Sequence, residues 1–466
     1  MTTDAAQPTE RFDPAAFATF RFTTRTLSDD GVVTLGYALD DAIAFEERFT
    51  LPAGTRVTDA DRARVDGLLA LLHWVTGVSY FKTAAPPRVA LDGPHPGPAA
   101  AALLEALYSE GLGEFAFTNR LPALPRPAFP RDGAWDGGSA AGVVAGAARP
   151  RSQAPRRVLV PVGGGKDSVV ALETVRRSGI ELALFSIGDA APIVRTVEVA
   201  GLPHLLARRR LDPGIGALNR AGALNGHVPV TAIVSCVALL TASLHGYDAV
   251  ALANERSASQ GNVAWDGIDV NHQFSKSLRA ERLLRAALAE VGAPADLFSL
   301  LRPASELAIA RAFSRLERYH PVFTSCNAIF RIDPALRARS WCGDCPKCRF
   351  VYLILAPFNA PSHLAEVFGR DLLADPAQYD GFALLTATGG HKPFECVGEE
   401  QESLAAIRLI AAQERWRDHA VVRRLAAEAL PAHPPADGDL DAVLALSDDH
   451  DVPDLLMPHV RALLGA

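Results

Sequence analysis

The sequence predicts an α/β fold in which helices cover both faces of a parallel sheet. Between residues 156 and 291, apolar β-branched stretches alternate with segments of helical periodicity. This alternation is typical of parallel sheets, which hold ligands at the carboxyl ends of their strands. Strands are expected at residues 157–162, 182–187, 204–207 and 249–253, and helices at residues 168–177, 192–199, 230–245 and 275–291.

The segments on either side have different patterns. Residues 17–52 alternate polar and apolar positions, as in an antiparallel meander, and helical patterns follow at 59–77 and 98–112. Residues 121–155 are dense in Pro, Gly and Ala, which is typical of a linker. The expected organisation is an N-terminal α+β domain at 1–150, the parallel-sheet domain at 151–325, a cysteine-containing segment at 326–400 and a helical tail at 401–466.

Composition narrows the class of protein. The chain of 466 residues is 49% hydrophobic and has a net charge of −7, so a general nucleic-acid binder is not expected. Its one basic run, Arg208-Arg209-Arg210, is interpreted as a solvated strand end. The polar N-terminus is not a secretory signal, and no apolar run approaches the length of about 18 residues that spans a membrane. We expect a cytoplasmic protein without nucleic-acid or membrane partners.

A glycine-rich loop follows the first expected strand of the parallel sheet. Backbone N–H groups at such a strand–loop–helix junction bind phosphate. A Walker A loop is excluded because Asp167 follows the lysine, and a dinucleotide fingerprint is excluded because Ser168 stands where a third glycine is needed. A tight turn without a ligand is the simpler alternative, but the ordered polar residues favour phosphate binding. The loop reads Gly163-Gly164-Gly165-Lys166-Asp167-Ser168.

This loop resembles the S-G-G-x-D-S loop of ATP pyrophosphatases, which split ATP into AMP and diphosphate. Gly163 stands where that pattern has its first serine, so one hydroxyl contact to the diphosphate is missing. The resemblance implies an adenine nucleotide α-hydrolase-like domain, also called a PP-loop domain.

The cysteines form a second motif. Cys342, Cys345 and Cys348 are spaced as two overlapping C-x-x-C steps, and Cys326 lies sixteen residues upstream of the first. Four thiolates around one point complete a tetrahedral structural zinc site, whereas an iron–sulfur cluster is the rival at similar spacing. The arrangement resembles the cysteine cluster that follows the PP-loop fold in 7-cyano-7-deazaguanine synthases.

Polar residues gather in three further segments. Asn254 and Glu255 follow an expected strand, and Asn262 and His272 come shortly after them. Ser275 is a possible helix cap and Lys276 a possible solvated residue of the first turn. The segment 389–398 places a lone cysteine, Cys396, among His, Lys and Glu. This density of polar groups favours a site at the ligand edge of the sheet, although spacing alone assigns no roles.

Together and in this order, the motifs resemble those of the UDP-N-acetylmuramoyl-L-alanyl-L-glutamate epimerases. The resemblance covers residues 20 to about 415 and includes segments 77–82 and 111–119. It implies that the terminal L-Glu of the UDP-muramoyl dipeptide is converted to D-Glu in peptidoglycan precursor synthesis. It also implies that ATP and Mg²⁺ are required, that AMP and diphosphate are released, and that a muramoyl-L-alanine L-glutamate ligase is a functional partner.

The same resemblance implies roles for the candidate residues. Adenylation of the α-carboxylate removes a negative charge beside Cα and so makes the Cα–H bond easier to deprotonate. A general acid or base works best with a pKa near the operating pH, which favours His272 or Cys396 over an exposed Lys276. The implied diphosphate contacts are Gly163, Gly164, Gly165 and Ser168, and Lys166 and Asp167 would neutralise phosphate and position Mg²⁺. Further cofactor contacts are Asn254 and Asn262. The implied acid/base or substrate-carboxylate contacts are Glu255, His272, Lys276 and Cys396.

Two other function classes fit part of the sequence. A PP-loop enzyme that modifies a nucleobase, by thiolation or as in 7-cyano-7-deazaguanine synthesis, would use the same loop and cysteines. A binding module on an inert scaffold would not need Lys166, Asp167 and Ser168. For the N-terminal domain we expect a part in binding the UDP-sugar.

Overall fold

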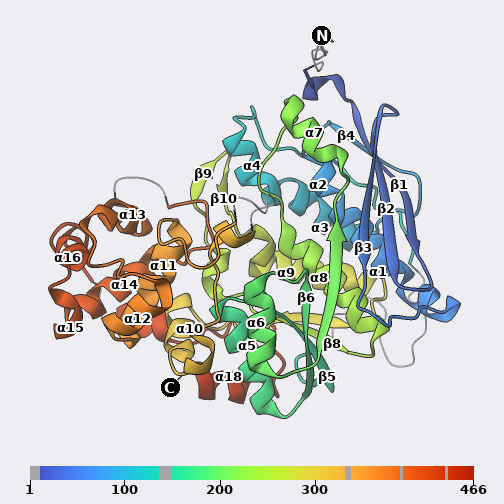
Figure 1. The fold of residues 1–466 in the computed structure, drawn as a ribbon. Coiled ribbons are helices and arrows are strands. Elements are labelled where there is room, and N and C mark those ends of the chain that lie inside the picture. Colours follow the sequence, from blue (N-terminus) through green and yellow to red (C-terminus); the bar gives the residue numbers. More distant parts are fainter. Residues whose placement is uncertain (1–10, 136–149, 331–336, 389–391, 436–438, 466) are drawn as a thin grey trace, which may run out of the picture.

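A mixed sheet of nine strands runs through the molecule (Figure 1). The computed structural model describes residues 11–135, 150–330, 337–388, 392–435 and 439–465. The strands of the sheet are β1 (Thr19–Leu27), β2 (Val32–Leu39), β3 (Ile43–Thr50), β4 (Arg88–Leu91), β5 (Arg157–Pro161), β6 (Glu181–Ile187), β7 (His204–Arg210), β8 (Ala249–Leu252) and β11 (Asp296–Ser299). Their order is β11-β8-β5-β6-β7-β3-β2-β1-β4, and a separate hairpin consists of β9 (Val263–Trp265) and β10 (Ile268–Val270).

The sheet has a parallel and an antiparallel half. Strands β11, β8, β5, β6 and β7 are all parallel, which confirms the four strands predicted from the alternating pattern. The predicted meander is confirmed as β1, β2 and β3, which pair antiparallel, and β4 adds a parallel edge strand. Strand β3 then pairs antiparallel with β7, so the N-terminal meander and the parallel strands form one sheet.

Helices lie on both faces of the sheet and make up the C-terminal part of the chain. Helix α1 begins at a capping box formed by Thr58 and Asp61, and α5 ends at Gly179, whose φ of 75° is left-handed. The helices are α1 (Asp59–Thr76), α2 (Val78–Phe81), α3 (Pro98–Tyr108), α4 (Gly113–Thr118), α5 (Lys166–Ser178), α6 (Ala191–Ala200), α7 (Gly214–Ala221), α8 (Val230–Leu244), α9 (Leu278–Glu290), α10 (Glu306–Phe313), α11 (Pro346–Leu355), α12 (Pro361–Phe368), α13 (Tyr379–Ala383), α14 (Glu400–Ala411), α15 (Glu414–Arg417), α16 (Ala420–Ala432), α17 (Asp439–Leu444) and α18 (Met457–Leu464).

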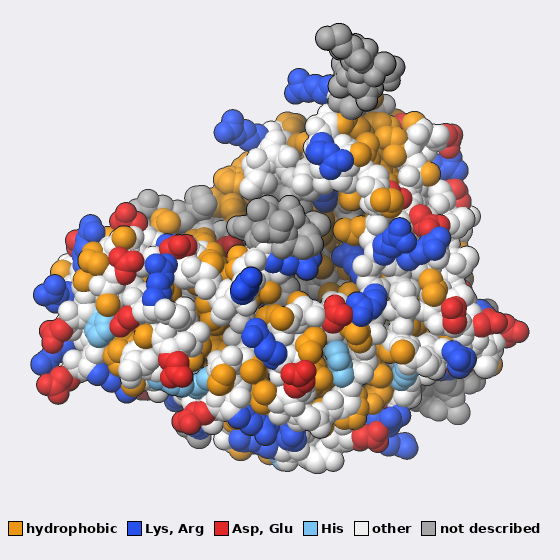
Figure 2. Space-filling model, in the orientation of Figure 1, with side chains coloured by type: hydrophobic (Ala, Val, Ile, Leu, Met, Phe, Trp, Pro, Cys, Tyr) orange, Lys and Arg blue, Asp and Glu red, His pale blue; other side chains and the backbone are white. Residues whose placement is uncertain are grey.

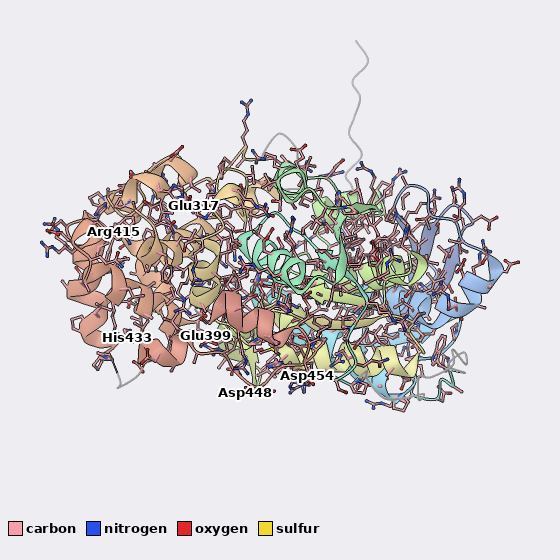
Figure 3. All side chains as sticks on the ribbon, turned by 90° about the horizontal axis from the view of Figure 1, so that it is seen from below. Glu317, Glu399, Arg415, His433, Asp448 and Asp454 are labelled. Atoms are coloured by element: carbon pink, nitrogen blue, oxygen red, sulfur yellow. The ribbon has the colours of Figure 1, made fainter. Side chains whose placement is uncertain are left out.

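Two hydrophobic cores lie on opposite faces of the parallel strands. Successive side chains of β5 point to different cores, as the pleat of a strand requires: Val158 and Val160 pack in one core and Leu159 packs in the other. The first core continues through α5, α10, α11 and α14, and the second through α1, α3, α8 and α9. The N-terminal strands and the C-terminal helices lie at opposite ends of the molecule (Figures 1 and 3).

The charges on the surface agree with the composition, in which basic and acidic residues occur in similar numbers. Basic and acidic side chains are interspersed on the face shown in Figure 2. Among the described residues, no helix is both long enough and apolar enough to cross a bilayer.

A buried ion pair joins the two halves of the sheet. Glu47 on β3 is fully buried, and its carboxylate accepts a hydrogen bond of 2.5 Å from Nε of Arg209 on β7. Arg209 also donates to Oγ of Ser79 at 2.9 Å, and its side chain is only 17% exposed. The interpretation of residues 208–210 as a solvated strand end is therefore wrong for Arg209, because its guanidinium compensates a buried carboxylate.

We expect the substitution Arg209→Met to lower the free energy of unfolding by about 3–5 kcal/mol, because it leaves the buried Glu47 carboxylate without a partner. The matched control is Arg208→Met on the same strand. Arg208 pairs with Asp189 at 2.8 Å, but both side chains are more than half exposed. That substitution should change stability by less than about 1 kcal/mol. Urea unfolding of both variants measures the difference, and equal effects would contradict the role given to Arg209.

Candidate active site

A cavity of about 380 Å³ lies at the carboxyl ends of β5, β6 and β8. This is the edge at which parallel α/β sheets bind ligands. Its apolar wall includes Phe185 and Ile187 at the end of β6, together with Ile193 of α6. The sequence-predicted residues that line the cavity are Gly163, Gly165, Asp167, Ser168, Asn254, Glu255, Lys276 and Cys396.

The glycine loop is held in one conformation by its neighbours. Gly164 has a left-handed φ of 83°, and a Cβ atom at this position would lie 2.6 Å from Cβ and 2.8 Å from the carbonyl carbon of Pro192. Its carbonyl oxygen accepts a hydrogen bond of 2.8 Å from the N–H of Thr324. By contrast, a Cβ atom on Gly163 would have no neighbour within 4 Å. The loop therefore requires glycine at position 164 but has room for a side chain at position 163.

Lys166 lies beneath the loop. The sequence predicts that Lys166 faces phosphate, whereas its side chain is 1% exposed and is not among those lining the cavity. Its ammonium group pairs with the Asp167 carboxylate at 2.5 Å and with the buried carboxylate of Glu306 on α10. Burial opposes the charge, but these two carboxylates outweigh it and raise the pKa of Lys166. Burial and the nearby Asp167 charge raise the pKa of Glu306 to about 7.

Two lysines surround Cys396 in the cavity. Nζ of Lys276 lies 3.5 Å from the Cys396 sulfur, and Nζ of Lys347 donates a hydrogen bond to the Cys396 carbonyl oxygen. Lys276 is half-buried, so its interpretation as a solvated first-turn residue is wrong. Helix α9 is capped by Ser277, which accepts from the N–H of Ala280, and not by Ser275.

The surroundings of Cys396 favour a thiolate. Burial opposes ionisation of the thiol, but the Lys276 charge, a hydrogen bond with His272 and the Lys347 charge outweigh it and lower the pKa of Cys396 to about 6. A thiolate is the reactive form of cysteine and can accept a proton. The cavity therefore contains a potential base near neutral pH.

His272 and Asn262 lie beside the cavity and do not line it. The Asn262 side chain accepts a hydrogen bond of 3.0 Å from the N–H of His272 and donates one of 2.8 Å to the Pro393 carbonyl oxygen. Asn262 thus connects two loops next to Cys396. The neighbouring residues 389–391, which belong to the predicted polar segment, lie outside the described residues.

Several functional candidates are missing from the sequence prediction. Ser325, Asn327 and Lys347 also line the cavity, and Glu306 compensates the charge of Lys166 beneath it. Lys347 lies between Cys345 and Cys348 in the C-P-K-C motif. The motif is already explained by the spacing of its cysteines, so it gives no separate signal for the lysine. Glu306 follows Ser305, the N-cap of α10. An acidic residue in the first turn of a helix is expected for helix stability alone, so the sequence gives no sign that Glu306 pairs with Lys166.

The four predicted cysteines come together. The sulfur of Cys345 lies 3.4 Å from that of Cys348 and 4.0 Å from that of Cys326, and the sulfurs of Cys342 and Cys348 are 3.7 Å apart. A tetrahedron of thiolates about 2.3 Å from one ion would place its sulfurs about 3.8 Å apart. Gly343 has a left-handed φ of 75°, which allows the turn between two of the ligands. The cluster therefore has the shape of a closed site for one metal ion.

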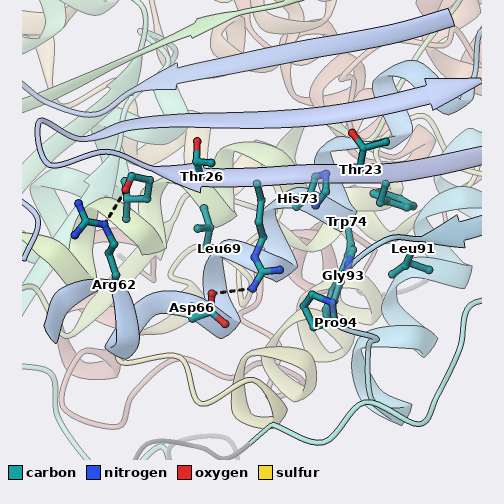
Figure 4. A pocket seen from close by; sticks show the side chains of 13 residues that line it. Thr23, Thr26, Arg62, Asp66, Leu69, His73, Trp74, Leu91, Gly93 and Pro94 are labelled. Carbon is teal, nitrogen blue, oxygen red and sulfur yellow. Dashed lines mark hydrogen bonds and ion pairs between the residues drawn. The ribbon is translucent and has the colours of Figure 1, made fainter. Parts of the chain in front are cut away.

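A larger cavity of about 480 Å³ lies at the other end of the sheet, between β1, α1 and the loop after β4 (Figure 4). Its two guanidinium groups already have partners, since Arg25 pairs with Asp66 at 2.7 Å and Arg62 donates to the Leu27 carbonyl oxygen at 2.9 Å. None of the predicted site residues lines this cavity. Eight of the predicted site residues instead line the cavity at the carboxyl ends of the parallel strands.

The chain has extensive similarity to curated proteins. It is 45% identical to the UDP-N-acetyl-alpha-D-muramoyl-L-alanyl-L-glutamate epimerase of a Micromonospora species, over 97% of this chain and 98% of that protein. It is 46% identical to the Salinispora tropica protein of the same name over 89% of this chain and 88% of that protein. The Xanthomonas oryzae pv. oryzae protein of this name is 40% identical over 97% of this chain and 98% of its own length.

Two family models match the chain in sequence order. The model of the MurL N-terminal domain matches residues 11–300, and the model of the MurL C-terminal domain matches residues 322–439. These matches agree with the full-length relatives and cover both the glycine loop and the cysteine cluster. The chain therefore belongs to the MurL family, the family of UDP-N-acetyl-α-D-muramoyl-L-alanyl-L-glutamate epimerases.

Proposed function

We propose that this protein converts the terminal L-Glu of UDP-N-acetylmuramoyl-L-alanyl-L-glutamate to D-Glu after adenylating its α-carboxylate with ATP. One observation carries the proposal: the glycine loop and the Cys396 thiol line the same cavity. A carboxylate activated at the loop would thus lie within reach of a base. The names of the relatives support this substrate over a nucleobase.

The cavity offers complementary groups to ATP. Gly163, Gly165 and Ser168 at the start of α5 would hold the diphosphate, because a helix N-terminus stabilises negative charge. The apolar wall near Phe185 would contact adenine. Asp167 has the hard carboxylate oxygens that Mg²⁺ prefers, and the bound ion would offset charge on the leaving diphosphate. Together these residues would form a PP-loop type of ATP site.

Adenylation makes the later proton transfer possible. A carboxylate oxygen attacks the α-phosphorus of ATP, and the bond to diphosphate breaks. In the resulting mixed anhydride the carboxyl group has lost its negative charge, so a base can take the Cα proton while the electron pair moves to the carbonyl oxygen. Reprotonation on the opposite face and hydrolysis release the D-Glu product and AMP. Lys276 and Lys347 supply positive charge for the substrate carboxylates.

The cysteine cluster would hold a structural Zn²⁺ ion. Its four ligand atoms all lie within 4.8 Å of one another, which leaves space for one ion but not for several irons and bridging sulfides. Four protein ligands leave no open coordination position, so the metal would stabilise the fold without joining the reaction. Helix α11 begins at Cys345 and contains Lys347, so the metal would also position a lysine of the cavity.

The proposed reaction belongs to peptidoglycan precursor synthesis. A ligase that adds L-Glu to UDP-N-acetylmuramoyl-L-alanine would supply the substrate.

The first prediction tests the reaction itself. With ATP and the UDP-muramoyl dipeptide in D₂O, mass spectrometry should find deuterium at Cα of the D-Glu product, with AMP formed in step with inversion. The Cys396→Ala variant should lose inversion at least 100-fold while still forming AMP, because adenylation does not need the Cα base. Inversion without ATP, or without deuterium from solvent, would contradict the proposal.

The second prediction tests the glycine loop with a matched pair of variants. Gly163→Ser adds a hydroxyl group where there is open space, and the KM for ATP should fall roughly fivefold, as one hydrogen bond of about 1 kcal/mol would produce. Gly164→Ala forces a side chain into Pro192 at a left-handed φ, so AMP formation should fall at least tenfold. Equal effects of the two substitutions on AMP formation would contradict the geometry assigned to the loop.

The third prediction concerns the metal. Cys345→Ser should release the metal and lower the melting temperature, because metal-binding energy in such a cluster is also folding energy. Cys236→Ser is the control, since Cys236 is a buried free cysteine of α8 away from the cluster. Metal analysis should find one zinc per chain in the wild type and the control. Iron with a visible chromophore would contradict the zinc assignment.

A further inference from the structure

The proposed function assigns no role to a polar cluster formed by Glu114, His227 and His272. Helix α4 places the Glu114 carboxylate against two histidines: its Oε2 atom contacts Nδ1 of His272 and lies 3.9 Å from Nδ1 of His227. The two imidazole rings are 4.4 Å apart between centroids. All three side chains are largely buried, with exposed fractions of 13–21%.

His272 has charged groups on two sides. Burial favours the neutral ring, but hydrogen bonds with Cys396 and with Glu114 outweigh it and raise the pKa of His272 to about 9. Glu395 adds a further negative charge near the ring. By contrast, burial and the neighbouring His272 charge lower the pKa of His227 to about 4, so this second ring is neutral. Between about pH 6 and pH 9, therefore, His272 is an imidazolium between a carboxylate and a thiolate.

Cys396, and not His272, faces the cavity. Cys396 lines the cavity, whereas His272 does not line it and is hydrogen-bonded to the thiol. The other charges around the thiol are the ammonium groups of Lys276 and Lys347 and the carboxylate of Glu395. Of these two groups, the sulfur is therefore the one presented to a Cα proton in the cavity.

We propose that Glu114 is a positioning residue that holds His272 as an imidazolium, and that His272 in turn holds Cys396 as the thiolate that takes the Cα proton. This inference rests on the proposed function. In the step, the Cα–H bond breaks, an S–H bond forms on Cys396, and the electron pair passes to the carbonyl oxygen of the adenylated substrate. The N-terminal segment 111–119 thus contributes a carboxylate to the proton-transfer machinery.

A metal centre is the competing explanation of the same cluster. Glu114, His227 and His272 offer three ligand atoms within 4.8 Å of one another. Metal binding, however, requires a neutral imidazole, and the thiol on the other side of His272 favours the protonated ring. The position of Cys396 also gives the charged histidine a function that a metal ligand would lack.

The titration of Cys396 in the full-length, metal-loaded protein tests the inference without any substrate. The rate of alkylation by iodoacetamide follows the thiolate fraction, and mass spectrometry of the Cys396 peptide isolates this cysteine. The wild type should be half-maximal near pH 6, as its pKa indicates. Glu114→Gln should move this midpoint up by about one unit, which makes alkylation at pH 6 about fivefold slower.

Two variants control for a structural effect. Glu110→Gln removes a carboxylate four residues earlier that pairs with Arg279 at 2.7 Å, and its midpoint should equal that of the wild type. Glu114→Asp keeps a carboxylate and should move the midpoint back toward pH 6. A midpoint in Glu114→Gln equal to that of the wild type would overturn the inference.

The remaining outcomes are also distinguishable. A second metal ion per chain that is lost in both Glu114→Gln and His227→Ala would overturn the inference in favour of a metal centre. A shifted midpoint in Glu114→Gln supports the relay from Glu114 to Cys396 even if the wild type forms no AMP. In that case the proposed ATP-dependent reaction would fail while the relay stands.

Discussion

The buried ammonium group of Lys166 is the constraint on which the rest of the site depends. A charge in this position is tolerated only with close compensation, since an unpaired buried charge destabilises a protein by several kcal/mol. Glu306 supplies it from α10, and the Glu306 N–H in turn donates to Glu402 at 2.7 Å. The other Glu402 oxygen accepts from the N–H of Glu399 at the start of α14. Loop, α10 and α14 are therefore positioned together.

The same network extends to the segment of the four cysteines and to the thiol. Nζ of Lys347 lies 3.9 Å from Glu306 and also contacts the backbone of Cys396. The segment that would bind ATP and the segment that carries the thiol thus share one set of buried charges. Burial and the charge of Glu306 raise the pKa of Glu402 to about 8, which limits the negative charge that accumulates in this interior. Such an arrangement would hold the groups for both stages of the proposed reaction in fixed positions relative to one another.

Local patterns in the sequence were sufficient for most of the fold. The strand–helix alternation located β5, β6, β7 and β8, because buried parallel strands are continuous apolar runs. Strand β11 was not predicted, since its four residues include Asp296 and Ser299 and show no clear periodicity. The pairing of β3 with β7 was also not predicted, because only three residue pairs make the contact and nothing local marks them.

In the candidate site, too, the sequence was sufficient for local motifs and insufficient for contacts between distant residues. Spacing was enough to bring the four cysteines and the glycine loop into the prediction. Residues that act through partners distant in sequence were missed: Glu306 pairs with a lysine 140 residues away, and Glu114 with a histidine 158 residues away. The burial of Lys276 was not predicted, because the cavity that it lines is built from many segments distant in sequence, among them 161–168, 252–255 and 325–327. The sequence shows which residues are charged, but only the folded structure shows which partners compensate a buried charge.

The continuity of the sheet has a consequence for the order of events during synthesis. The meander β1–β3 leaves the ribosome first, but β3 finds its second neighbour only when β7 has been made, since Glu47 and Arg209 are 162 residues apart. Until then β3 has an unpaired edge and a carboxylate without its guanidinium. Such long-range pairing is slow, because the closure of a long loop must precede any stabilising contact. The nascent chain therefore carries an open sheet edge from the completion of β3 to that of β7, about a third of its synthesis, and this interval is when it is most exposed to aggregation.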